Sequence, residues 1–216
     1  MDKKKIGLIR VLTTNDESLL KSHENILKEK FPSFELETKC IKDQPKGVYN
    51  DDTLRIAIPK ILNLAHEFED KGFDVVYISC ASDPGIDECR SELRIPVIGA
   101  GSACASLALS FGSKIGVLGI MDKAPDAVYR ILKDSLVCDL KPDGVSTVLD
   151  LYTDKGIQKV MDSVKQLKEK GCDAIALACT GMSTIKVYKK IIEEANIMAI
   201  DPVIAAGTII SYLSYS

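Results

Sequence analysis

The sequence has 216 residues, with 28 lysines and arginines against 31 aspartates and glutamates, and its formal charge is −3 with both histidines neutral. Aromatic residues make up 6% of the chain and no basic run exceeds three residues, so we expect no nucleic-acid partner. No apolar run approaches the roughly 20 residues of a membrane-spanning helix, and the start of the chain lacks a cleavage-site pattern. We therefore expect a folded cytoplasmic protein without a membrane partner, whose core draws on 46% hydrophobic residues.

Short β-branched runs alternate with longer segments of helical period, which is typical of an α/β fold with parallel strands and crossover helices. In the first half the expected elements are strand 5–12, helix 17–30, strand 34–41, helix 52–69, strand 74–79, helix 86–93, strand 95–98 and helix 103–111. In the second half they are strand 114–120, helix 126–136, strand 145–149, helix 155–170, strand 173–178, helix 184–194, strand 197–200 and helix 202–213. Pro59 predicts a kink or a later start for its helix.

The second half repeats the first in sequence as well as in element order. KKKIGLIRV matches GSKIGVLGI, KGFDVVYISCASD matches KGCDAIALACTGM, and IPVIGAGSACASLALS matches IMAIDPVIAAGTIISY. A period of about 100 residues is too long for a solenoid repeat and fits a two-lobed α/β protein with a cleft between its lobes. We expect one lobe over residues 1–98 and the other over 99–201, with the C-terminal helix 202–216 packed back on the first lobe.

Seven cysteines form an odd set without a Cys-x-x-Cys pair, which argues against a disulfide framework and against a zinc site. Cys80 and Cys179 differ from the others because each ends the equivalent third strand of its half and precedes a short turn that opens a helix. Ligands of parallel sheets bind beyond the carboxyl ends of the strands, where helix N-termini present free N–H groups. We expect the remaining five to pack as small hydrophobic side chains: Cys40, Cys89, Cys104, Cys138 and Cys172.

Two lobes related by approximate two-fold symmetry would bring Cys80 and Cys179 to the cleft from opposite sides, which suits the inversion of a carbon acid. A thiolate removes a proton from one face of the stereocentre and a thiol returns one to the other face, so no metal or organic cofactor is needed. A facing helix N-terminus lowers a thiol pKa from about 8.5, so we expect a reactive thiolate near neutral pH. The sulfurs should lie about 6–8 Å apart, too far for a disulfide.

Several polar residues near these turns are candidates for helix caps. Asp83 is the expected cap of the helix after the first cysteine, with Pro84 in its first position, and Ser183 is the expected cap after the second. Asp201 is expected to cap the last helix. The segment Gly99-Ala100-Gly101 lacks the third glycine of a dinucleotide-binding loop, which disfavours nucleotide binding.

The turn after the first strand also holds candidate substrate contacts. Arg10 ends that strand, where it either recognises a substrate carboxylate through its guanidinium or lies on the surface. Within the segment 13–15, we expect one residue to cap the following helix and Thr13 to contact the substrate. His23 and His66 lie on predicted helices without a partner motif, and we interpret both as structural or surface residues.

Three segments carry a family resemblance. ISCASDPGIDECRSELRIPVIG has a cysteine followed by Asp-Pro-Gly and Ile-Pro-Val, ALACTGM carries the second cysteine, and IDPVIAA lies near the C-terminus. These motifs resemble those of hydantoin and allantoin racemases in the aspartate/glutamate/hydantoin racemase superfamily, and the resemblance covers essentially the whole chain. It implies two pseudo-symmetric Rossmann-like (flavodoxin-like) parallel-sheet lobes with the active site between them, a small-molecule substrate and a homo-oligomer. It further implies cofactor-independent proton transfer by Cys80 and Cys179, with substrate oxygens held at Ala81, Ser82, Thr180 and Gly181.

Departures from the family pattern bear on the substrate. Hydantoin racemases favour an asparagine-rich turn where this chain has Arg10-Val11-Leu12-Thr13-Thr14-Asn15. Glutamate racemases resemble the chain less, because they carry Asp-Ser-Gly after the first strand and a histidine after the second cysteine. Related decarboxylases keep only the second cysteine, so Cys80 argues against that activity. We expect a racemase of a hydantoin-like cyclic amide or an amino acid; the alternatives are a maleate-type cis–trans isomerase, a non-catalytic two-lobed binding protein and a thiol-based redox protein.

Overall fold

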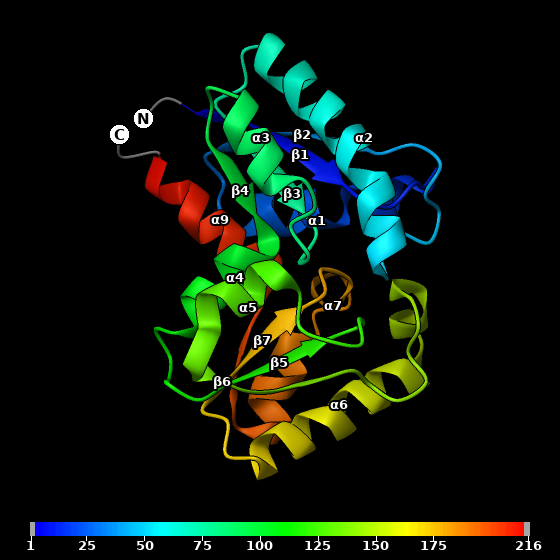
Figure 1. Cartoon of the computed structure of the whole chain (residues 1–216), viewed down its shortest axis with the longest axis vertical. Coiled ribbons are helices and arrows are strands. Elements are labelled where there is room, and N and C mark those ends of the chain that lie inside the picture. Colours follow the sequence, from blue (N-terminus) through cyan, green and yellow to red (C-terminus); the bar gives the residue numbers. More distant parts are fainter. Residues whose placement is uncertain (1–2, 214–216) are drawn as a thin grey trace.

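Two four-stranded parallel sheets, one from each half of the chain, form the frame of the computed structural model, which describes residues 3–213 (Figure 1). The first sheet has the order β2-β1-β3-β4 and the second the order β6-β5-β7-β8, so the second half repeats the topology of the first. This arrangement confirms the predicted two-lobed α/β fold with parallel sheets. The strands are β1 (Lys4–Arg10), β2 (Phe34–Cys40), β3 (Val75–Ser79), β4 (Val97–Gly99), β5 (Ile115–Gly119), β6 (Leu136–Leu140), β7 (Ala174–Ala178) and β8 (Met198–Ile200).

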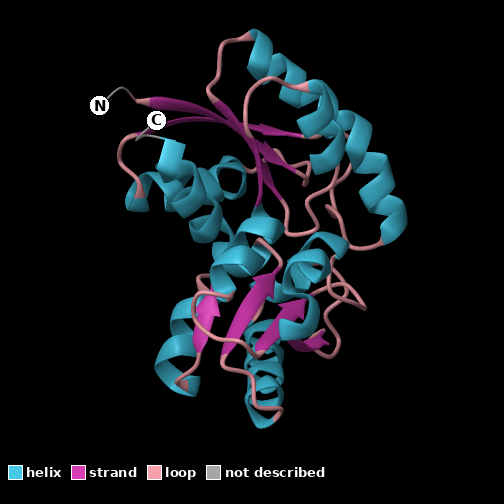
Figure 2. Cartoon of the chain, turned by 60° about the vertical axis from the view of Figure 1, so that its left-hand side comes forward, coloured by secondary structure: helices cyan, strands magenta, loops and turns pink. Residues whose placement is uncertain are grey.

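Helices cover both faces of the sheets (Figure 2). The α-helices are α1 (Glu17–Lys30), α2 (Asp51–Asp70), α3 (Ile86–Glu92), α4 (Ala100–Ala108), α5 (Asp126–Leu132), α6 (Asp154–Glu169), α7 (Gly181–Thr184), α8 (Val187–Lys190) and α9 (Pro202–Tyr212). Short 3-10 helices η1 (Lys133–Ser135) and η2 (Val148–Tyr152) and the π-helical turn η3 (Ile191–Ala195) complete the described elements. Within residues 3–213, no helix is both long enough and apolar enough to cross a bilayer.

The central strands are apolar because both of their faces are covered. Successive side chains of a strand point to opposite faces of its sheet, so Tyr77 of β3 packs into one hydrophobic cluster and Ile78 into another. The first cluster continues through α4 and α9 into the second sheet, where it includes Ala176 of β7. The two lobes therefore share part of their core.

The C-terminal helix contributes to this shared core. Helix α9 lies against α1, β3 and β4 of the first half, and also against α4 and β7. The division at residues 98 and 99 stays a prediction, and residues 214–216 of the expected helix 202–216 lie outside the described part of the chain.

The helix ends in the first half differ from expectation at two places. The side chain of Asp16 caps α1 by accepting hydrogen bonds from two backbone N–H groups, so the prediction of a cap within residues 13–15 is wrong. Helix α2 begins at Asp51 and runs through Pro59, so it has no later start. The capping box of Asn50 and Thr53 fixes its first turn upstream of the proline.

The largest correction concerns the strand predicted at residues 145–149. The edge strand of the second sheet is instead β6, which follows directly on α5 and η1 after a turn at Lys133 with φ of +45°. Thr147 and Asp150 form a capping box that favours the helical turn η2 over an extended strand. The alternating apolar residues at 145–149 predict a strand, but hydrogen bonds of the Thr147 and Asp150 side chains stabilise a helical turn there instead.

The helix predicted over residues 184–194 is broken. It starts earlier, as α7, and Lys186 then adopts a left-handed conformation with φ of +52° before α8 and η3 continue the chain. Ser183 consequently lies inside α7 and is not its cap.

Candidate active site

The carboxyl ends of the central strands of both sheets meet at one cavity. Arg10 ends β1, Cys80 follows β3, Ile120 follows β5 and Cys179 follows β7, and all four line this cavity. Because parallel strands end at the same edge of a sheet, the duplicated topology brings equivalent positions of the two lobes together. The cysteine cavity, as we call it, is thus built by both halves of the chain.

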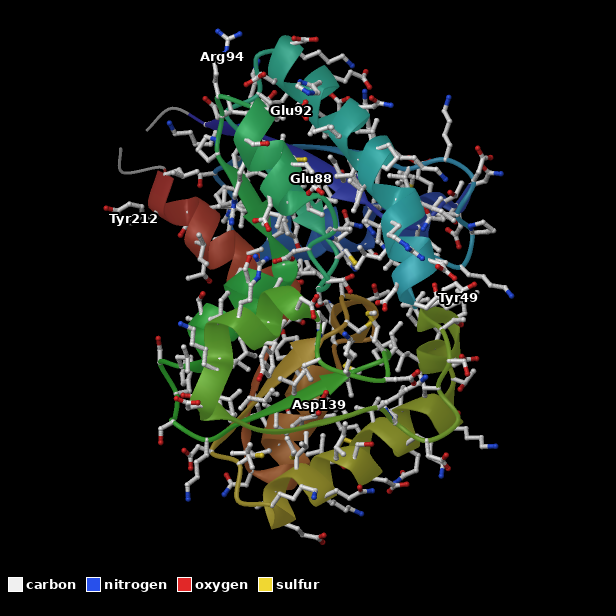
Figure 3. The ribbon with its side chains drawn as sticks, in the orientation of Figure 1. Tyr49, Glu88, Glu92, Arg94, Asp139 and Tyr212 are labelled. Carbon is white, nitrogen blue, oxygen red and sulfur yellow. The ribbon has the colours of Figure 1, made fainter. Side chains whose placement is uncertain are left out.

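The cysteine cavity is small, with a volume of about 40 Å³. Val48 and Val148 line it from the loop before α2 and from η2. Tyr49, beside Val48, packs against the hydrophobic core of the second lobe at the junction between the lobes (Figure 3). Segments of both lobes therefore flank the cavity.

Both cysteines are buried free thiols with 7% exposure. Burial raises the pKa of Cys80 to about 12 and that of Cys179 to about 11. The N–H of Ser82 bonds Cys80, and the N–H groups of Gly181 and Met182 bond Cys179; each of these bonds acts in the opposite direction and lowers the pKa. The predicted lowering of the thiol pKa below its ordinary value is therefore wrong, because desolvation outweighs the backbone donors.

The two sulfurs also act on each other. The charge of a Cys179 thiolate raises the pKa of Cys80, and so does the nearby carboxylate of Asp83. Ionisation of one thiol therefore disfavours ionisation of the other. One thiolate facing one thiol is the favoured ionised state of the pair.

The loop after Cys80 is anchored to the start of α4. Asp83 accepts hydrogen bonds of 2.7 Å from the N–H groups of Gly101 and Ser102, so its carboxylate caps α4 and not the helix that follows it in sequence. Helix α3 begins only at Ile86, which places Pro84 outside it and overturns both expected roles. A Cβ atom at Gly101 would lie 1.9 Å from the carbonyl oxygen of Ala81, so this approach requires glycine.

The second cysteine loop has the same anchor with the partners exchanged. Ser183 donates a 2.9 Å hydrogen bond to the carboxylate of Asp201, which also accepts from the N–H groups of Val203 and Ile204. Asp201 thus caps α9, as predicted. One buried carboxylate therefore joins each cysteine loop to the N-terminus of a later helix. In the first half Asp83 of the loop caps α4, and in the second half Asp201 at the start of α9 binds Ser183 after the loop.

Most predicted substrate contacts lie at the cavity. Its lining includes Arg10, Ala81, Ser82, Thr180 and Gly181. Thr13 does not contribute to it: the Thr13 hydroxyl donates to the carbonyl of Ile41 at 2.7 Å and accepts from the N–H of Gln44 at 2.8 Å. Arg10 is 4% exposed, so its alternative assignment to the surface is wrong.

His23 connects the two cysteine loops. Its Nδ1 atom lies 2.7 Å from the hydroxyl of Ser79, just before Cys80, and its Nε2 atom lies 3.0 Å from the hydroxyl of Thr184 in α7. Burial, followed by the charge of Arg10, holds the pKa of His23 well below its ordinary value. The neutral ring therefore donates through one nitrogen and accepts through the other, in a structural bridge between the lobes.

Tyr152 is a polar cavity residue that the sequence did not indicate. It lies in η2, inside the region wrongly expected to be a strand and loop, and no motif precedes it. Tyr152 packs against the core of the second lobe and lines a cavity that both lobes build, and local sequence patterns do not specify this placement. Among residues 3–213, no cluster of three or more His, Cys, Asp or Glu side chains is placed to hold a metal ion.

Comparison with known proteins agrees with this geometry. Residues 6–209 match the family described as Asp/Glu/Hydantoin racemase. The chain is 24% identical to a hydantoin racemase from Rhizobium meliloti over 170 residues, which cover 76% of this chain and 70% of the relative.

Solved structures share the fold. An allantoin racemase from Klebsiella pneumoniae superposes with a TM-score of 0.85 at 22% identity, covering 98% of this chain and 88% of the other. A glutamate racemase from Bacillus anthracis gives a TM-score of 0.73 at 16% identity, covering 99% of this chain and 82% of the other. Because the family match spans nearly the whole chain and the two-lobed fold agrees, the chain belongs to the Asp/Glu/hydantoin racemase family, whose racemases are isomerases.

Proposed function

We propose that this chain is a cytoplasmic, cofactor-independent racemase in which Cys80 and Cys179 invert the Cα centre of a small molecule. The observation that carries the proposal is the presence of both sulfurs in one cavity, at equivalent strand ends of two duplicated sheets. Removal and return of a proton on opposite faces of a carbon require two acid–base groups on opposite sides. A duplicated architecture supplies such a pair from a single chain.

In the forward direction, one thiolate removes the Cα proton and the opposite thiol protonates the other face. The product state is the mirror arrangement, in which the first sulfur carries the proton and the second is the thiolate, so the reverse reaction uses the same two groups. The mutual effect of Cys179 and Cys80 favours the required state with a single thiolate. Burial makes that thiolate a stronger base toward a carbon acid, although it also makes it scarcer.

Backbone donors can stabilise the charge that develops on substrate oxygen when Cα loses its proton. The N–H groups of Ser82, Gly181 and Met182 act on the two sulfurs, whereas those of Ala81 and Thr180 donate to no backbone carbonyl of residues 3–213. We propose that the latter two hold the substrate's carbonyl or carboxylate oxygen. One well-placed donor of this kind contributes roughly 3–4 kcal/mol to transition-state stabilisation.

The proposed substrate is a hydantoin-like cyclic amide or an amino acid. Relatives named as hydantoin racemase and allantoin racemase support the first class, and a neighbour named as glutamate racemase supports the second. We also propose a homo-oligomer in solution, as the family resemblance implies, which light scattering of the purified chain would test.

The proposal is tested by incubating hydantoins, allantoin, aspartate, glutamate and maleate with the protein in heavy water. Polarimetry and proton NMR should detect loss of optical rotation together with deuterium at Cα for one of the chiral compounds. Cys80→Ala and Cys179→Ala should each abolish interconversion, while Cys89→Ala, a buried thiol outside the cavity, should retain it. Normal racemisation by both single variants would overturn the mechanism, and thermal stabilisation by a ligand without deuterium uptake would indicate a binding protein.

A further inference from the structure

Arg10 is a buried cation whose donors are only partly used. Arg10 is buried, with 4% of its surface exposed. Nη1 donates all of the side chain's hydrogen bonds to described residues. Those bonds go to the carbonyl oxygens of Leu19 and Leu20, at 2.8 and 3.1 Å, and to the hydroxyl of Ser22 at 2.9 Å. Nε–H and both hydrogens of Nη2 remain, and together they form an edge that matches a carboxylate bidentately.

No acid neutralises this cation. Among residues 3–213, no aspartate or glutamate forms an ion pair with Arg10, although fifteen other ion pairs connect described residues. A buried charge without a counter-ion is costly, because the desolvation penalty is not offset by attraction to an opposite charge. Arg10 contributes to the lining of the cysteine cavity, so an anion bound there would supply the missing partner.

Tyr152 provides a second unsatisfied group in the same cavity. Its hydroxyl oxygen is buried and forms no hydrogen bond of acceptable geometry with any described residue. The neighbouring hydroxyl of Thr184 lies near enough to lower the pKa of Tyr152, but the two hydroxyls do not have hydrogen-bond geometry. Burial is the larger effect and raises the pKa of Tyr152, so the group is a neutral phenol with a hydrogen to donate.

These two groups come from opposite lobes. Arg10 ends β1 of the first sheet, and Tyr152 ends η2 in the second half of the chain. The charge of Arg10 and that of a Cys179 thiolate both act on the Tyr152 hydroxyl, which places the three groups in one neighbourhood. Tyr152 also lines a separate outer groove of about 460 Å³ between α1 and α7, so it stands between the cysteine cavity and that groove.

The other polar groups of the cavity are already committed. The Ser82 hydroxyl contacts the sulfur of Met121 at 3.2 Å, and the Thr180 hydroxyl donates to the carbonyl of Ser79 at 3.3 Å. Much of the remaining lining is aliphatic, including Val11, Leu12, Val48, Ile120 and Val148. Besides the two thiols, Arg10 and Tyr152 are therefore the cavity side chains with an N–H or O–H donor that has no partner among the described residues.

We propose that Arg10 and Tyr152 form an anion subsite that binds a carboxylate of the substrate, with the Nε and Nη2 edge of Arg10 on its oxygens and the Tyr152 hydroxyl donating to one of them. The inference rests on the proposed function and narrows its substrate class. An open-chain acid satisfies the buried cation, whereas a neutral cyclic amide leaves it unpaired. The subsite thus selects a carboxylate-bearing substrate, such as an amino acid, over a hydantoin-like ring.

Binding of two achiral probes tests the subsite without requiring turnover. Succinate and succinimide share a four-carbon skeleton, but only succinate carries carboxylates. Calorimetric titration should show succinate binding at least about tenfold more tightly than succinimide, because a charge-assisted hydrogen bond contributes more than a neutral one. Equal binding of the two probes would overturn the inference.

Substitution of Tyr152 tests whether its hydroxyl belongs to the subsite. Tyr152→Phe removes one oxygen and should weaken succinate binding roughly ten- to a hundredfold, with little change for succinimide. Tyr188→Phe, which alters a tyrosine packed on the same lobe outside the cavity, should leave both affinities unchanged. Unchanged succinate affinity in Tyr152→Phe would overturn the subsite even if the wild type racemises its substrate. Conversely, Tyr152-dependent succinate binding without racemisation of any substrate would retain the subsite and overturn the proposed function.

Discussion

The catalytic rate should increase steeply with pH, because burial keeps both thiols protonated in the free protein. The pKa of Cys179 is about 11 and that of Cys80 about 12. At pH 7 the ionised fraction of Cys179 is therefore about one in 10⁴, and this fraction grows tenfold with each pH unit. Forming that thiolate at pH 7 costs about 5.5 kcal/mol, at roughly 1.4 kcal/mol for each tenfold step.

The assay is kcat/KM for racemisation between about pH 6 and pH 10 at constant ionic strength, since this parameter reports ionisations of the free enzyme. We expect its logarithm to rise with a slope near 1 and without a plateau below about pH 9. The difference in thiolate ultraviolet absorbance between the wild type and each of Cys80→Ser and Cys179→Ser measures the same ionisations separately. A plateau reached at neutral pH would refute the reasoning that desolvation outweighs the backbone donors at these sulfurs.

Two stability predictions concern the anchor between the first cysteine loop and α4. Burial raises the pKa of Asp83 from 3.8 to about 6. As pH rises, Asp83 therefore ionises in the unfolded chain before it ionises in the folded protein, and the free energy of unfolding decreases up to about pH 6. The neutral Asp83→Asn variant lacks this dependence. Urea unfolding should show its stability relative to wild type increasing by about 2.4 kcal/mol from pH 4 to pH 7, and parallel curves would contradict the account. Gly101→Ala places a Cβ 1.9 Å from the carbonyl oxygen of Ala81 and should cost about 1–3 kcal/mol in unfolding free energy; a variant as stable as wild type would show that this approach is not constrained.

Local sequence patterns are sufficient to predict the two parallel sheets and the position of the two cysteines at their strand ends. The β-branched runs and their helical partners recur in both halves, and parallel strands place Cys80 and Cys179 beyond their carboxyl ends whatever the details of packing. The cap at Asp201 was equally accessible, because a polar residue followed by proline at the start of an apolar helix is a local signal.

The remaining features depend on which segments meet in space. Asp83 caps α4 through residues 18 and 19 positions later, and no local rule selects that partner over its own helix. Tyr152 of η2 lines the cavity together with residues of the first lobe, such as Arg10, and no local pattern around η2 specifies that meeting. The raised pKa values of the two thiols also depend on tertiary structure. The sequence shows the helix N-termini that lower a thiol pKa, but it does not show the burial by both lobes that raises it more.

Isotope exchange by single-cysteine variants tests most directly whether each thiol serves one face of the substrate. In heavy water, Cys80→Ser and Cys179→Ser should each exchange the Cα proton of only one enantiomer, without inversion, and the two variants should choose opposite enantiomers. The wild type should incorporate deuterium while interconverting both. A variant that exchanges both enantiomers alike, or two variants that choose the same one, would contradict a mechanism with one sulfur on each side.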